Sequence, residues 1–444
     1  MSSTTSAFRP SLQRESDSQA GILGLSLNVP VVTLIGYVSL FAIAFGNLVD
    51  VETENSSIGF GGQALIKVMF LALGGLYGGV GVLTDMKVRR LLLSFPMMWM
   101  SLLLLFFFIA VPTSPTVFSS LASTISIACV LTMTATALVQ LGVKNVMRTV
   151  FYGASTFVLG SWLAYWFMPS VGVFLEATTE GQFIHRMGGL AHPNTLGQTS
   201  GVTLVLGLLL YRDDKKFSWF RALVIVAAAA ALIGSLSRTS LLATIFAVVM
   251  VFRMHIFQRR CMLTAIACGV AGIILLIAAS MFTDIESKVG AKLGMLSKSG
   301  ETSELTSATG RTEIWAKTIE LIAQRPAQGY GAATSKVLLK DYSRHTHNLI
   351  LNIMLSTGVI GGLIAVWMCF ERLIRLFVAR HPIADALVVL ILVNGLFENV
   401  IFSILCGLPT IIWIIALALP TIEAIEHEEQ NPRPTAKILR LAAR

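Results

Sequence analysis

Charged side chains are scarce in this sequence. Lys, Arg, Asp and Glu together make up 13% of the 444 residues, whereas hydrophobic residues make up 55%. Soluble globular domains carry about 25% charged residues, so this composition excludes a soluble domain of the same size. Runs of about 20 apolar residues recur along the chain, and each is long enough to cross a hydrocarbon core of about 30 Å as a helix.

These runs predict about twelve membrane-spanning segments and an all-α integral membrane protein. We expect helices because a chain in lipid must satisfy its backbone hydrogen bonds within its own segments. The seventh and eighth segments are short and are separated by a polar turn at 235–240. The expected spans are 31–49, 64–83, 91–111, 117–139, 146–168, 191–211, 222–236, 239–252, 261–282, 347–370, 383–402 and 404–422.

The distribution of basic residues predicts the orientation of the chain. The net charge is +9, yet the basic residues of the short loops lie in alternate loops, which is the positive-inside pattern of a membrane protein rather than a nucleic-acid surface. Residues 50–63 are acidic and residues 112–116 carry no charge. We therefore expect a bacterial inner-membrane protein with both termini in the cytoplasm. The basic loops contain Lys87, Arg89 and Arg90; Lys144 and Arg148; Arg212, Lys215, Lys216 and Arg221; Arg253, Arg259 and Arg260; and Arg372, Arg375 and Arg380.

The same alternation divides the chain into membrane and aqueous parts. No cleavable signal peptide is visible, so the first span is expected to act as an uncleaved signal. All five cysteines fall in apolar spans, without the spacing of a disulfide framework or a metal site. The expected parts are a disordered cytoplasmic tail at 1–28, spans 1–9 at 29–281, a periplasmic loop at 282–346, spans 10–12 at 347–422 and a cytoplasmic tail at 423–444.

The periplasmic loop has a helical pattern of its own. Residues 312–324 predict an amphipathic helix on the outer membrane surface. Arg325-Pro326 ends it, because the residue before a proline avoids the helical region. Gly329-Tyr330-Gly331 predicts a turn, and 332–342 a second short helix. The apolar face of the first helix is expected to contain Ile314, Trp315, Ile319 and Ile322.

Three arginines on the outer side are candidate ligands for an anionic substrate. They are Arg186, Arg238 and Arg311. A guanidinium group binds phosphate with two parallel hydrogen bonds and stays charged at all relevant pH values. Arg238 lies in a short turn between two spans, where a charge is costly unless it is paired or functional. The alternative for Arg238 is an interfacial arginine whose side chain extends to water.

Four of the seven histidines face outward: His185, His192, His345 and His347. Two stand beside asparagines, in His192-Pro193-Asn194 and His347-Asn348. A neutral histidine at such a place is able to take a proton from an attacking sugar hydroxyl. The alternatives are a helix-end cap or a metal site, although no HxxxH or HExxH spacing supports a metal.

Glu398 is the remaining unusual residue, because it is an ionisable side chain near the outer end of the expected span 383–402. It either orients a histidine, binds an acceptor sugar, or simply extends to the interface. Charges are otherwise absent near mid-span, which argues against a secondary transporter. A flippase for a lipid-linked oligosaccharide is the competing function of another class. No phosphate-binding loop or nucleotide-binding fold is visible.

Several short motifs, in order, resemble the bacterial O-antigen ligase and polysaccharide polymerase superfamily. The likeness covers about residues 185–365, while the first five spans match only in hydrophobicity and number. The motifs are Gly189-Leu190-Ala191-His192-Pro193-Asn194, Ser235-Leu236-Ser237-Arg238, Gly310-Arg311-Thr312-x-x-Trp315, Arg325-Pro326-x-x-Gly329-Tyr330-Gly331, and His347-Asn348 followed by Ser356-Thr357-Gly358.

This resemblance implies a metal-independent, inverting membrane glycosyltransferase of the GT-C-like type, with a periplasmic active site and no cofactor. The donor is a glycan on undecaprenyl diphosphate. Arg186 and Arg238 match diphosphate-binding positions, and Arg311 matches a further motif arginine that we add to the diphosphate-binding candidates. His347, or the nearby His345, matches the catalytic base. His192, Asn194, Asn348 and Glu398 are candidates for orienting the substrate.

The residues of the Gly310–Trp315 and Arg325–Gly331 motifs resemble those of exopolysaccharide polymerases more closely. They favour a polymerase of lipid-linked repeat units in O-antigen or exopolysaccharide synthesis. The alternative is a ligase that transfers the glycan to the lipid A core.

Overall fold

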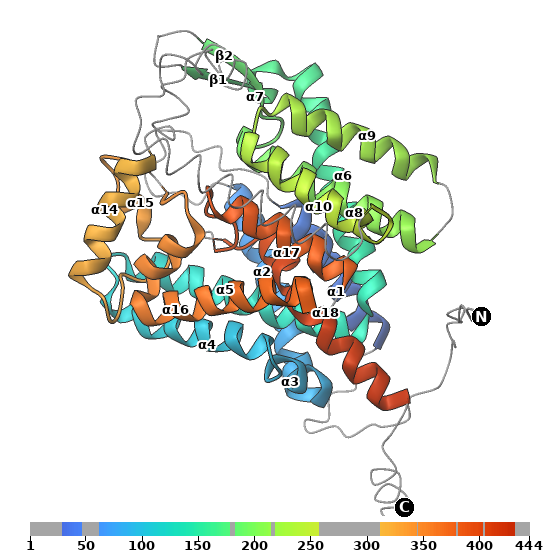
Figure 1. The fold of residues 1–444 in the computed structure, drawn as a ribbon, viewed down its shortest axis with the longest axis horizontal. Helices are drawn as coiled ribbons and strands as arrows, with labels where there is room; N and C mark the ends of the chain where they lie inside the picture. The colour runs from blue at the N-terminus through green and yellow to red at the C-terminus, as the bar shows by residue number, and fades with distance from the viewer. Residues whose placement is uncertain are drawn as a thin grey trace, which may run out of the picture.

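The computed structural model describes residues 29–46, 62–177, 183–214, 218–256, 311–343, 345–378, 381–402 and 405–430. These residues are mostly helical (Figure 1), which confirms the predicted fold class in general terms. A helix overlaps every expected span that falls among them, whereas the ninth span, 261–282, lies outside the described residues.

The helices and strands follow one another in a single order. The first half contains α1 (Val29–Phe45), α2 (Gly62–Thr84), α3 (Met86–Leu92), α4 (Met97–Ala110), the 3₁₀ turn Val111–Thr113, α5 (Val117–Gln140), α6 (Val143–Phe167), α7 (Pro169–Gly172), β1 (Val173–Ala177) and β2 (Phe183–Met187). The second half contains α8 (Pro193–Asp214), α9 (Trp219–Gly234), α10 (Arg238–Ile256), α14 (Arg311–Gln324), α15 (Ser335–Leu338), α16 (Leu349–Val378), α17 (Pro382–Gly395) and α18 (Leu408–Gln430).

Four of the described helices are long and apolar enough to cross a membrane, within α2, α5, α16 and α18. A fifth candidate arises if α3 and the helical stretch Met97–Thr113, which meet at a bend of 78°, form one broken span. Shorter apolar helices lie within α1, α9, α10 and α17. The protein therefore has four or five clear candidate spans in the described part of the chain, and the total of about twelve stays a prediction.

Glycines let α2 and α5 approach closely. A Cβ atom added to Gly75 would lie 2.4 Å from the Cys129 sulfur, and one added to Gly78 would lie 2.4 Å from the backbone nitrogen of Met133. Gly79, on the same helix, has nothing within 4 Å of its Cβ position. Small residues four apart allow such contacts between helices. Helix α2 has two such pairs, Gly74 with Gly78 and Gly75 with Gly79.

The predicted helix, turn and short helix within the expected loop 282–346 are confirmed as α14, the Gly329–Gly331 turn and α15. Figure 1 shows α14 and α15 beside the beginning of α16. Ile314, Leu321 and Ile322 of α14 pack with Tyr330 and Leu355. The predicted apolar face was wrong at Ile319, which is 56% exposed, because Leu321 and Thr318 turn inward instead.

The turn is locked against a break in α16. The Tyr330 and Gly331 amides donate to the Leu355 and Ser356 carbonyls, at 2.8 Å each. Gly358 has a φ of 75°, and its Cβ would lie 2.6 Å from the Pro326 carbonyl oxygen. A left-handed backbone beside another carbonyl requires glycine. Helix α16 is therefore two helical pieces, joined where the Gly329–Gly331 turn packs against it.

Two local features differ from the expected spans and loops. Residues between α7 and α8 form an antiparallel hairpin, in which Phe174 of β1 pairs with Arg186 of β2. Helix α17 ends at Gly395, several residues before the expected end of its span, so Glu398 follows in a turn rather than on a helix. Both features place polar side chains where the ends of α8, α14 and α16 converge.

Candidate functional site

The carboxylate of Glu398 is the centre of a polar network, and its side chain is only 12% exposed. Arg311 Nη2 and Asn194 Nδ2 each donate to Glu398 Oε1 at 2.9 Å. Glu398 Oε2 lies 3.1 Å from His347 Nδ1. These partners come from the first turn of α14, the first turn of α8 and the segment before α16. Folding therefore brings together four candidate residues that are distant in sequence.

Glu398 is held in its ionised form. Burial on its own raises the pKa of this carboxyl, but the hydrogen bond with His347 and the charges of His347, Arg311 and His345 outweigh burial and hold the pKa below its ordinary value. Glu398 belongs to the expected span 383–402, but it lies beyond Gly395, the last residue of α17, and so outside the helix itself. An ionised carboxylate only accepts hydrogen bonds, so the ring nitrogen Nδ1 of His347 carries a proton.

The carboxylate therefore fixes which nitrogen of His347 can act as a base. In the neutral ring, Nε2 bears the lone pair, and it lies 3.2 Å from the Ser343 hydroxyl oxygen. His347 has a φ of 48°, an uncommon backbone conformation for a residue other than glycine. The Trp315 indole nitrogen donates to the carbonyl of Thr346 at 3.0 Å and holds the preceding residue in place.

Arg186 extends the network into the hairpin and is almost completely buried, with its side chain 2% exposed. Its Nη1 is 2.5 Å from Glu176 Oε2, its Nη2 donates to Asn194 Oδ1 at 2.9 Å, and its Nε donates to the Ser235 carbonyl at 2.9 Å. Asn194 thus accepts from Arg186 and donates to Glu398. A continuous chain of hydrogen bonds joins the hairpin to His347.

The other candidate residues lie around this network. Arg238, the first residue of α10, is exposed, and the neighbouring Ser240 donates to Asn394 at 3.2 Å. His192 is exposed; its Nδ1 accepts from the Asn194 amide, and its ring meets Phe174 at a centroid distance of 5.0 Å. The exposed His185 lies on β2, next to Arg186.

Two candidates beside His347 have different surroundings. The ring of His345 is exposed and lies 6.2 Å from the ring of His347. Asn348 Oδ1 accepts from the Leu351 amide and caps α16, while its Nδ2 donates to the Leu396 carbonyl. Asn348 therefore ties the start of α16 to the segment that carries Glu398.

Sequence reasoning missed Glu176 and Ser343. Glu176 and Arg186 are diagonal neighbours on one face of the hairpin, since the register pairs Phe174 with Arg186 and Glu176 with Ile184. Recognising the hairpin would have identified that pair. Ser343 gives no sequence signal, because its contact with His347 depends on the turn that follows α15.

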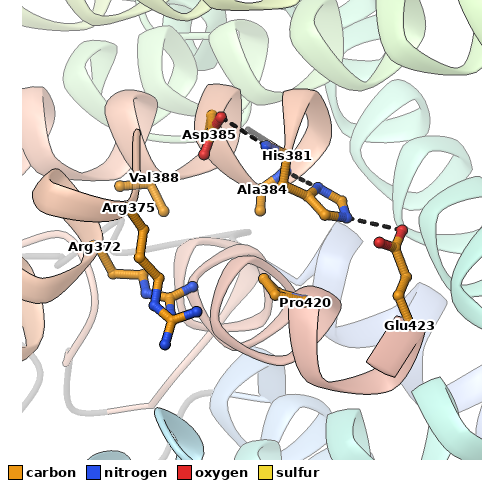
Figure 2. Close-up of a pocket in the computed structure, with 8 residues that line it drawn as sticks. All are labelled: Arg372, Arg375, His381, Ala384, Asp385, Val388, Pro420 and Glu423. Carbon is orange, nitrogen blue, oxygen red and sulfur yellow. Dashed lines mark hydrogen bonds and ion pairs between the residues drawn. The ribbon is translucent and has the colours of Figure 1, made fainter. Parts of the chain in front are cut away.

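A second polar cluster lies at the opposite ends of α16 and α17. A cavity of about 170 Å³ is lined there by Arg372, Arg375, His381, Asp385 and Glu423 together with Ala384, Val388 and Pro420 (Figure 2). His381 precedes α17 and Glu398 follows it, so about 20 Å of helix separates the two clusters. Glu371, next to this cavity, contacts both Arg372 and Arg375. This cluster joins helix ends and is not part of the Glu398 network.

The Glu398 network has the parts that an acid–base group transfer requires. The His347 ring, oriented by a buried carboxylate, is chemically able to act as a base, and the Arg311 guanidinium contacts the same carboxylate with its side chain 19% exposed. Among the described residues, no three His, Cys, Asp or Glu side chains form a group that could hold a metal ion.

Comparison with known proteins gives one match. Residues 223–366, about a third of the chain, match the family described as O-antigen ligase. The matched part contains Arg238, Arg311, Ser343 and His347, whereas Arg186, Asn194 and Glu398 lie outside it. No curated protein and no solved structure shows a significant match. The family match over residues 223–366 agrees with the motifs, which resemble those of the superfamily of O-antigen ligases and polysaccharide polymerases.

Proposed function

We propose that the protein is a membrane glycosyltransferase that polymerises oligosaccharide repeat units linked to undecaprenyl diphosphate, at the periplasmic face of the inner membrane. The observation that carries this proposal is the network in which Glu398 joins Arg311, Asn194 and His347. It combines a positioned base with guanidinium groups, in a chain of the O-antigen ligase family.

In the proposed reaction, the acceptor hydroxyl attacks the anomeric carbon of the donor and the bond to the diphosphate breaks. The hydroxyl proton goes to the base that His347 provides, and Glu398 stabilises the imidazolium ion that forms. Arg311 and the exposed Arg238 bind the departing diphosphate, whose charge grows in the transition state. Direct displacement inverts the anomeric configuration, and no metal ion or cofactor is required.

Arg186 has a different role in this proposal. Its side chain is buried and engaged with Glu176, Asn194 and Ser235, so little of it can meet a ligand. We assign it to positioning Asn194, which in turn holds Glu398. Its positive charge still adds to the field at the diphosphate.

A deletion strain of the source bacterium tests the proposal. Glycans are separated on a gel into lipid-linked and lipid A-linked material. A polymerase deletion leaves single repeat units without long chains, whereas a ligase deletion leaves long chains on undecaprenyl diphosphate. An unchanged pattern of both kinds of glycan would contradict a transferase function and support a transporter.

Complementation of that strain tests the base. His347→Ala is expected to lower transfer by about 10²-fold to 10⁴-fold, the range that a general base contributes, while His345→Ala keeps most of it. The amount of each variant in the membrane is measured as the control. The reverse ranking would assign the base to His345.

A further inference from the structure

Both ring nitrogens of His347 have partners within the chain. Nδ1 faces the Glu398 carboxylate at 3.1 Å, and Nε2 faces the Ser343 hydroxyl at 3.2 Å. A base can only take a proton at a nitrogen with an accessible lone pair. An acceptor hydroxyl must therefore either displace Ser343 from Nε2 or reach Nε2 through it.

The hydroxyl of Ser343 is suited to the second route. A serine hydroxyl donates one hydrogen bond and accepts two. Ser343 donates to the lone pair of His347 Nε2 and accepts from the His345 amide at 3.2 Å. Among the described residues no other hydrogen bond reaches this oxygen, so one acceptor position is left for an incoming hydroxyl.

Displacement is opposed by the way Ser343 is fixed. Its amide donates to the Leu339 carbonyl at 2.8 Å, and the Tyr342 amide donates to the same carbonyl. Leu339 is completely buried and packs in the cluster of α14 and α16. Because the backbone is fixed, the hydroxyl can leave His347 only by rotation about χ1, which would break its hydrogen bond from the His345 amide, whereas a relay requires no such rotation. The Ser343 side chain is nevertheless partly exposed, as a contact with substrate demands.

We propose that Ser343 is a catalytic residue that relays the acceptor proton to His347. This inference rests on the proposed glycosyl transfer. The acceptor oxygen forms its bond to the anomeric carbon as the bond to the diphosphate oxygen breaks. In the same step the acceptor proton moves to Ser343 Oγ, and the Ser343 proton moves to His347 Nε2. The serine is regenerated, His347 becomes a cation beside Glu398, and the diphosphate leaves with its electron pair.

The relay is tested with purified full-length protein in detergent, using lipid-linked oligosaccharide extracted from the deletion strain as donor and acceptor. Ser343→Ala is expected to lower kcat by about 10-fold to 10²-fold, within the contribution of a proton-transfer group. Ser343→Thr keeps a hydroxyl and is expected to stay within about threefold of wild type. Ser119→Ala is the matched control: it removes a half-buried serine hydroxyl at the start of α5, outside the network.

Mixtures of light and heavy water give a second readout that a structural role would not change. Two protons move in the relay, so the dependence of the wild-type rate on deuterium fraction is expected to curve, and Ser343→Ala to give a straight line. A Ser343→Ala variant as active as wild type, or more active, would overturn the relay and show that the serine only occupies the acceptor position. Absence of transfer by wild type would overturn the proposed function itself, and the relay with it.

Discussion

Glu398 illustrates how single residues acquire their chemistry in this protein. A carboxyl this buried is normally pushed toward its neutral form. Here the hydrogen bond with His347 and the nearby positive charges prevail, so the pKa of Glu398 is lowered. The negative charge is retained where it can hold the proton on His347 Nδ1 and leave Nε2 as the base.

Glu398→Gln is expected to lower kcat by about 10²-fold or more, because a neutral amide neither fixes the His347 ring nor stabilises its protonated form. Transfer by the purified variant checks this. Wild-type activity in Glu398→Gln would remove the carboxylate from the mechanism.

The lowered pKa of Glu398 also predicts a pH dependence of stability. The carboxylate stabilises the folded state fully above the ordinary glutamate pKa of 4.5, and this contribution is lost as the pH falls through the lowered pKa. The melting temperature of wild type should therefore exceed that of Glu398→Gln at neutral pH, and the difference should shrink in acid. A difference that does not change with pH would contradict the coupling.

At the scale of the elements, the approach of α2 to α5 decides which glycines can be replaced. The Cβ position of Gly78 meets backbone atoms of α5, which cannot rotate away, whereas that of Gly79 meets nothing within 4 Å. Both residues follow the same small-residue pattern in the sequence, so only the orientation of α2 distinguishes them.

Gly78→Ala is expected to destabilise the protein by about 1–3 kcal/mol, the usual cost of overpacking. Gly79→Ala is the matched control and is expected to be neutral or slightly stabilising, because alanine favours the helix. Thermal unfolding in detergent measures both. Equal effects of the two substitutions would mean that α2 packs on α5 through another face.

At the scale of the whole molecule, the two polar clusters lie at opposite ends of α17. The Glu398 network follows its last residue, and the Arg372–Glu423 cavity surrounds its first turn. The positive-inside pattern predicts that the network faces the periplasm and the cavity the cytoplasm. This arrangement agrees with a substrate that reaches the site from the outer leaflet.

Single cysteines in a variant whose five native cysteines are replaced by alanine test that orientation. Ile319→Cys, on the exposed face of α14, is expected to react with a membrane-impermeant maleimide in cells whose outer membrane has been permeabilised. His427→Cys, near the end of α18, is expected to react only after lysis. The opposite pattern would reverse the orientation.

The sequence by itself predicted an apolar, mostly helical protein and its resemblance to the O-antigen ligase family, which residues 223–366 match. These depend on local composition: apolar runs of sufficient length, basic loops in alternation, and short motifs read along the chain. Helix α14 and its turn were predictable for the same reason, since Pro326 and the glycines act on their own neighbours.

Only the tertiary structure decided which candidates meet. Arg186, Arg311 and His347 were chosen for their chemistry, and nothing local says that Glu398 lies within reach of Arg311 and His347, or that Asn194 connects Glu398 to Arg186. The contacts of Glu176 and Ser343 were beyond the sequence, because one depends on an unrecognised hairpin register and the other on a turn held by Leu339. Hydrogen bonds between distant segments arise only when packing fixes the segment ends, and here that packing joins the starts of α8, α14 and α16 to the end of α17.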